Sequence, residues 1–239
     1  HYTGSNSWVS PKLYVRRGVS LATPKVTTTM LTPQASNSAD AQARWHARAE
    51  FVALISAHGE DVPLDQAAGW MCAEERGLDT IAPMMATLDT LASGVFIPTD
   101  STTIEAVARL NHHLFTELGF SGDPTHFDAP DNSLLDSVLQ SRKGLPILLS
   151  MVMLEVGRRA GLNLHGIGFP THFLVSPAEA TPRFFVDPFN DGRVLRTDQL
   201  EAWFGRISNR SNHRMPPFSW WLKPTSCRQI LMRMNNNLK

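Results

Sequence analysis

The sequence predicts an α+β protein, in which a helical N-terminal portion precedes a core made of one buried helix and a small antiparallel sheet. Apolar residues recur every three or four positions over 40–120, as they do on amphipathic helices. A mostly apolar stretch at 146–160 is typical of a central helix. Short apolar segments at 164–169, 172–176 and 183–187 are typical of neighbouring antiparallel strands.

The helical portion, 40–120, divides at residues that end helices. Trp45, Ala49 and Val52 share one apolar face, and the run stops before Gly59 and Pro63. Glycine often follows the last turn of a helix, because it accepts the left-handed conformation needed there. Further helices that each precede a glycine are predicted at 64–75, 83–91 and 102–118.

The core, predicted over 121–225, opens with a polar loop at 119–132. Ser133 is then predicted to cap a short apolar helix, because serine side chains accept from free amides at helix starts. Pro146 suits the first turn of the central helix, since the amide hydrogen that proline lacks has no partner there. Gly161 ends that helix and leads into the strands. A short helix near 199–204 follows the sheet.

The two ends of the chain differ in composition from the rest. Residues 1–39 contain no Asp or Glu and are rich in Ser, Thr and Pro, which predicts a polar, flexible leader. Residues 226–239 predict a C-terminal helix, on which Ile230, Leu231, Met234 and Leu238 form an apolar stripe. This stripe either packs back on the core or awaits a missing helical module or a protein partner.

Bulk composition narrows the class of protein. Of the 239 residues, 42% are hydrophobic, and 22 basic residues balance 22 acidic ones, which argues against a nucleic-acid-binding surface. Cys72 and Cys227 stand alone, so the sequence predicts no zinc site, no disulfide, a reducing compartment and hence a cytoplasmic location. The longest apolar run, 145–154, is too short to cross a bilayer. No cofactor is predicted.

One order of residues in the core carries chemical meaning: a buried helix, then a strand with His172, then a strand that ends in Asp187. In thiol enzymes a helix N-terminus lowers the pKa of a cysteine, a histidine acts as base and then as acid, and an aspartate fixes the histidine tautomer. Each residue also has an ordinary interpretation. His172 alone would be read as a core histidine, and Asp187 before Pro188 as a turn cap.

Three segments, Asn132-Ser-Leu-Leu-Asp through Gly144-Leu-Pro-Ile, Gly166-Ile-Gly-Phe-Pro-Thr-His and Phe185-Val-Asp-Pro-Phe-Asn, resemble the SirB-type transglutaminase-like family of the transglutaminase and papain superfamily. The resemblance spans about 39–239. It implies a transglutaminase-like core, with tetratricopeptide-type repeats after it in most members. It also places Pro146 where active relatives have their cysteine, which proline cannot replace as a nucleophile. The resemblance therefore indicates a non-catalytic pseudoenzyme that serves as a binding, scaffold or regulatory module.

A rival hypothesis keeps catalysis: a hydrolase or acyltransferase that uses His172 and Asp187 with another nucleophile, such as Cys72, a serine or an activated water. Metal binding by His112, His113 and His126 is disfavoured, because adjacent histidines on a helix point apart. Polar residues near the start of the central helix are candidates for ligand binding: Asn132, Arg142, Lys143 and Ser150.

Overall fold

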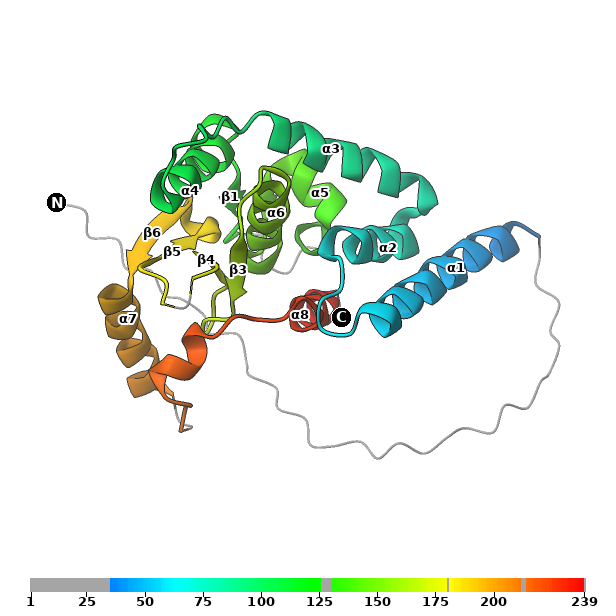
Figure 1. Ribbon diagram of the computed structural model, residues 1–239. Coiled ribbons are helices and arrows are strands. Elements are labelled where there is room, and N and C mark those ends of the chain that lie inside the picture. The colour runs from blue at the N-terminus through cyan, green and yellow to red at the C-terminus, as the bar shows by residue number, and fades with distance from the viewer. Residues whose placement is uncertain (1–34, 126–129, 180, 212–213, 239) are drawn as a thin grey trace. The chain divides into compact units, whose positions relative to one another are not determined.

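A four-stranded antiparallel sheet packs beside a central helix in the computed structural model, which describes residues 35–125, 130–179, 181–211 and 214–238 (Figure 1). The protein therefore combines helices with a sheet, as predicted for the α+β class. The predicted leader at 1–39 lies outside the described residues apart from 35–39, which form the start of the first helix. No helix within the described ranges is long and apolar enough to cross a membrane.

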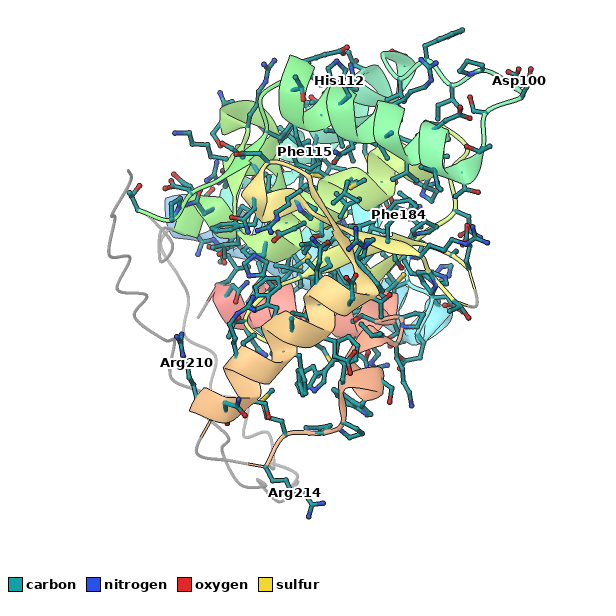
Figure 2. The ribbon with its side chains drawn as sticks, turned by 90° about the vertical axis from the view of Figure 1, so that its left-hand side faces the viewer. Asp100, His112, Phe115, Phe184, Arg210 and Arg214 are labelled. Atoms are coloured by element: carbon teal, nitrogen blue, oxygen red, sulfur yellow. The ribbon has the colours of Figure 1, made fainter. Side chains whose placement is uncertain are left out.

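The helical portion of the described chain contains three α-helices, of which the second and third are joined by a short 3-10 turn, and a fourth that changes its winding. A capping box between Thr102 and Glu105 starts the fourth helix, and at His112 the helix widens into a π-helical turn. The helix predicted at 102–118 is thus present, but its second half has π-helical winding, and Leu114 and Phe115 in that half are both buried. Figure 2 labels Phe115. The elements are α1 (Ala35–His58), α2 (Leu64–Arg76), η1 (Leu78–Thr80), α3 (Ile81–Ser93), α4 (Thr103–Asn111) and η2 (His112–Glu117).

Helix α6 (Pro146–Arg159) is the centre of the fold, and every residue from Pro146 to Gly157 is buried. Pro146 occupies its first turn, with Leu145 as the N-cap. Before it come η3 (Pro130–Ser133) and α5 (Leu135–Ser141). The predicted Ser133 cap is wrong, because Ser133 belongs to the preceding 3-10 turn. Leu134 is the N-cap of α5 instead, and its side chain makes no capping hydrogen bond. A parallel pair of two-residue strands, β1 (Ser121–Gly122) and β2 (Lys143–Gly144), leads into α6.

The sheet has the order β3-β4-β5-β6. Asp187, the last residue of β5, pairs with Arg193 of β6. The strand predicted at 172–176 begins at Leu174 in the structure, two residues later than predicted. A turn precedes it, in which the His172 amide donates to the Phe169 carbonyl. The last strand was not predicted. The strands are β3 (Leu164–Ile167), β4 (Leu174–Pro177), β5 (Phe184–Asp187) and β6 (Arg193–Arg196).

The two faces of the sheet are covered by different helices (Figure 1). One face packs on α6 through a set that we call the α6-side cluster, in which Phe173, Val175, Val186 and Phe189 meet Leu148 and Met151. The other face packs on α7 (Thr197–Arg210) and η5 (Phe218–Leu222). This second set, the α7-side cluster, comprises Ile167, Phe169, Leu174, Phe185, Leu195 and Leu200 with half-buried Trp203, Phe204, Ile207, Phe218, Trp221 and Leu222.

The C-terminal helix α8 (Cys227–Asn237) packs back on the protein. Ser226 caps it, and Ile230, Leu231 and Met234 are buried in the α6-side cluster. Leu238 packs against the same cluster. The apolar stripe that the sequence left open is therefore covered by the chain itself, so its burial stabilises this fold.

A cluster of charges fastens α2 to the C-terminal end of α6. The Arg159 guanidinium lies 2.6 Å from an Asp65 oxygen and 2.7 Å from a Glu155 oxygen, and Arg158 reaches the same two carboxylates. Burial raises the pKa of Glu155, and the nearby Asp65 charge raises it further, although both arginines act in the opposite direction. The burial cost of the carboxylate therefore outweighs its ion pairs.

Candidate functional site

His172 and Asp187 lie side by side, as the sequence order suggested. The His172 Nε2 atom is 3.1 Å from Asp187 Oδ2. Asp187 ends β5 and its side chain is 1% exposed, whereas the His172 ring, on the turn before β4, is 14% exposed. A buried carboxylate needs hydrogen-bond donors around it, and the imidazole supplies one of them.

Asp187 also organises the turn that follows it. Its Oδ1 accepts from the Phe189 amide at 3.2 Å, and its Oδ2 accepts from the Asn190 side-chain amide at 2.7 Å. Asn190 Nδ2 also lies 3.2 Å from His172 Nε2. The two interpretations of Asp187, partner of a histidine and cap of a turn, are therefore both realised in one carboxylate.

The His172 ring lies where the two apolar clusters meet. Phe189 from the α6-side cluster contacts one side, with ring centres 5.7 Å apart, and Trp203 from α7 contacts another at 4.9 Å. Its second nitrogen, Nδ1, is 3.1 Å from the Thr171 carbonyl oxygen. Within the described part of the chain, no hydroxyl or thiol is hydrogen-bonded to the ring. The ring is thus held between oxygen acceptors and aromatic faces.

The residue before the histidine adopts a strained backbone. Thr171 has a φ of 63°, in the left-handed region that β-branched residues rarely occupy. The turn places the Thr171 carbonyl against the His172 ring, and the His172 amide donates to Phe169 at 3.1 Å. Such strain persists only where surrounding contacts impose it, so the position of His172 is fixed by the fold.

The start of α6 connects to the pair through the β1–β2 strands. Gly122 on β1 lies so close to the Phe189 carbonyl that a Cβ there would overlap it, and Phe189 contacts His172. One turn into α6, Ser150 donates a hydrogen bond of 3.0 Å to the carbonyl of Phe173. Its hydroxyl is fully buried and used in this bond, so Ser150 is placed as a link between helix and strand.

The other predicted binding residues lie near the same end of α6 but serve local structure. The Asn132 carbonyl accepts from the Leu145 amide at 3.3 Å. Arg142 ends α5 in a left-handed conformation, and its guanidinium donates to the Leu118 carbonyl at 2.7 Å. Lys143, on β2, is exposed. Asn132 and Arg142 thus hold the loops around the start of α6, and neither is hydrogen-bonded to the pair.

Cys72 and Cys227 are poor candidates for a nucleophile. Burial raises the pKa of Cys72 to about 12, and its thiol lies against Asp136 and Leu135 of α5. Burial also raises the pKa of Cys227. Among the described residues, neither sulfur is hydrogen-bonded to His172.

Metal binding by the three histidines, which the sequence disfavoured, concerns only two described residues. His112 and His113 both approach Glu117, at 3.5 and 2.7 Å, while His126 lies outside the described residues. No group of three potential metal ligands occurs among the residues that the structure describes.

A pocket of about 370 Å³ opens beside the pair on the α7 side of the sheet. The pocket is lined by Asn190 and Trp203, which contact the pair but were not indicated by the sequence. Arg193 and Arg206 also line it. Asn190 had a local signal, because in Asp187-Pro-Phe-Asn a 3-10 turn returns the fourth residue to the first. Trp203 and the arginines are brought here only by tertiary packing.

Along the chain come a buried helix, a histidine just before the second strand of the sheet and an aspartate at the end of its third strand, which is the order of parts in a transglutaminase-like arrangement. Residues 77–236 match the profile of the Transglutaminase-like superfamily, and the chain belongs to this superfamily.

The chain is similar to several UPF0162 proteins. It is 36% identical over 135 residues to one from Xylella fastidiosa, which covers 55% of this chain and 47% of the relative. It is 30% identical over 182 residues to one from Pseudomonas aeruginosa, which covers 75% and 65%. The match thus spans about half the length of the Xylella relative. A similarity of 25% over 193 residues links it to human F-box only protein 21, covering 77% of this chain and 29% of that protein. No solved structure matches the chain.

Proposed function

We propose that this chain is a transglutaminase-like binding module in which thiol-based acyl transfer is absent. The observation that supports this most directly is Pro146 at the first turn of α6, where the superfamily resemblance expects a cysteine. Proline has neither a nucleophilic atom nor a proton to donate, so no thioester can form there. The nearest alternative on the same helix, Ser150, is committed to the Phe173 carbonyl.

In this proposal the His172–Asp187 pair is a structural element at the edge of the pocket, which Asp187 lines. Asp187 is saturated by His172, Asn190 and the Phe189 amide, and both ring nitrogens of His172 lie near oxygen acceptors. The fixed pair, held by the aromatic rings of Phe189 and Trp203, keeps one wall of the pocket in place, so that a ligand could bind there without reacting.

The finer assignment is to the SirB-type branch of the superfamily, on the three segments that resemble it. A protein partner at α8 would contact its exposed side, where Met232 is 58% exposed, because the apolar stripe is buried. The free cysteines support a reducing, cytoplasmic compartment.

A thiol-reactive probe tests the absence of a catalytic thiol. Native protein treated with iodoacetamide at pH 8 should label Cys72 far more slowly than unfolded protein, because with a pKa of about 12 roughly one thiol in ten thousand is ionised. The rate should be the same in His172→Ala. Rapid labelling of either cysteine that is lost in His172→Ala would overturn the proposal.

A second candidate function, a hydrolase that activates water, is favoured by the 3.1 Å His172–Asp187 geometry, which is that of a histidine oriented by a carboxylate. Hydrolysis of p-nitrophenyl acetate by wild type, His172→Ala and Asp187→Asn decides between the two. Turnover that falls together in both variants would establish the hydrolase, whereas equal background rates in all three proteins fit the binding module.

A further inference from the structure

The pocket on the α7 side of the sheet has two regular walls. Asp187, Arg193 and Leu195 alternate along β5 and β6 so that they share the face of the sheet that is turned to α7. Gln199, Trp203 and Arg206 are spaced by four and three along α7, which places them on one face of that helix. The pocket is therefore built by a strand face and a helix face. Figure 1 shows α7 next to β6, the strand that it follows in the chain.

The charges of the pocket are unbalanced. Within the described ranges, Arg193 and Arg206 take part in no ion pair, whereas the neighbouring Arg196 is paired with Asp198 at 2.9 Å. Asp187, the one carboxylate in the lining, already accepts from His172, Asn190 and the Phe189 amide. Among the described residues, the two guanidinium groups that line the pocket thus have no carboxylate partner, and the one carboxylate beside them already accepts from three donors.

The apolar part of the pocket limits what the anion can be. Buried Leu195 and half-buried Trp203 both line it. Guanidinium groups bind planar oxyanions through paired hydrogen bonds, and an aromatic wall favours a flat or apolar body next to them. The lining carries a net charge of one positive unit, which matches a single carboxylate better than a doubly charged phosphate.

We propose that this pocket binds a carboxylate group carried on an apolar or aromatic body, with Arg193 and Arg206 as its partners and Trp203 as its wall. The proposal deepens the proposed function, on which it rests, by naming the ligand class of the binding module. A volume of about 370 Å³ is at the lower end of ligand pockets and suits a group the size of one or two amino-acid residues.

The test uses the full chain, labelled with ¹⁵N, and follows the indole N–H signals of its six tryptophans by NMR. A Trp203→Phe variant assigns the Trp203 signal. Benzoate should shift this signal, and benzamide, which is neutral but has the same shape, should not. An equal shift with benzamide would overturn the proposal, and so would a benzoate shift confined to other tryptophans.

Variants locate the site. Arg193→Gln and Arg206→Gln should each weaken benzoate binding about tenfold, since each removes a charge-assisted hydrogen-bond donor. Arg210→Gln is the matched control, because Arg210 is on the same helix one turn further on and outside the pocket lining (Figure 2). Unchanged affinity in both pocket variants would refute the site. All three arginines are exposed, so the fold should tolerate the changes.

Two further probes define the anion and its source. Phenyl phosphate that binds more tightly than benzoate would overturn the choice of a carboxylate. The peptide acetyl-Ala-Ala-Phe should bind when its C-terminal carboxylate is free and should not bind when that group is an amide. If the free peptide binds more tightly than benzoate, the natural ligand is a peptide C-terminus; if it binds more weakly, the ligand is a small free acid. The two proposals fail in different measurements. Ester hydrolysis that depends on His172 would overturn the binding-module function without changing benzoate binding, whereas loss of benzoate binding would overturn only the ligand class.

Discussion

The two faces of the sheet differ in how completely they are closed. The α6-side cluster consists mainly of fully buried side chains from α2, α3, α5, α6 and α8 together with the sheet. The α7-side cluster has a small buried centre, and half-buried aromatic residues such as Trp203 and Phe218 surround it. The pocket and the edge of the His172–Asp187 pair belong to the second face. One face therefore supplies most of the stability, and the other leaves room for a ligand.

The largest effect should come from truncating a leucine on the closed face. Leu148→Ala, at a position with no exposed surface in the middle of α6, should lower the free energy of unfolding by about 2–5 kcal/mol, because the cavity cannot collapse. Leu222→Ala on the α7-side cluster should cost about 1 kcal/mol, since that side chain is only half-buried. Urea unfolding measures both, and equal losses would remove the distinction between the faces.

A smaller loss should follow when the pair at the border of the faces is broken. Asp187→Ala removes the acceptor of three hydrogen bonds and should cost about 1–3 kcal/mol. Asp198→Ala, at an exposed position on α7, is the control and should cost less. If the two variants unfold at the same denaturant concentration, Asp187 is not the organising residue of its turn.

Relief of backbone strain should act in the opposite direction. Thr171→Gly should raise the free energy of unfolding by about 1 kcal/mol, because glycine adopts a φ of 63° without strain, while its greater freedom in the unfolded chain offsets part of the gain. The same variant should leave the Leu148 region unaffected. A loss of stability in thermal unfolding would show that the Thr171 side chain contributes contacts that outweigh the strain.

The smallest effect concerns pH and the closed face. The pKa of Glu155 is raised above its ordinary value of 4.5 by burial, so the folded protein binds this proton more tightly than the unfolded chain does. The contribution of Glu155 to stability is therefore full below pH 4.5 and falls as pH rises through the folded-state pKa. Urea unfolding between pH 4 and 7 should show this decline in the wild type and a flatter profile in Glu155→Gln; parallel profiles would contradict it.

The sequence predicted the closed face better than the open one. The apolar run at 146–160 sufficed for α6, because a helix that is buried all round needs no partner to be recognised. Strand β6 was missed because Leu195 is the only buried residue in its four-residue span. The turn before β4 was missed because nothing in the chain's periodicity shows that Thr171 takes a left-handed conformation.

The site divides in the same way. His172 and Asp187 were predicted because a strand with a histidine precedes a strand that ends in an aspartate, and the structure brings the two side chains within 3.1 Å. Trp203, Arg193 and Arg206 were not, since they come from two elements whose packing angle no local pattern encodes. Asn132, Arg142 and Ser150 were chosen because they lie near the start of the central helix. The side chains of Arg142 and Ser150 donate to backbone carbonyls, and that of Asn132 donates to Asp123.

The burial of α6 on all sides has a consequence for exchange with solvent. Its amide hydrogens from Leu149 to Gly157 are shielded both by the hydrogen bonds of the helix and by the elements around it. Deuterium can therefore reach them only when the whole domain opens, so their exchange rates report global unfolding. Helix α7 has one fully buried residue, Leu200, and its amides should exchange through local openings that leave α6 intact. Deuterium uptake would thus separate a ligand that tightens the α7 face from one that stabilises the entire fold.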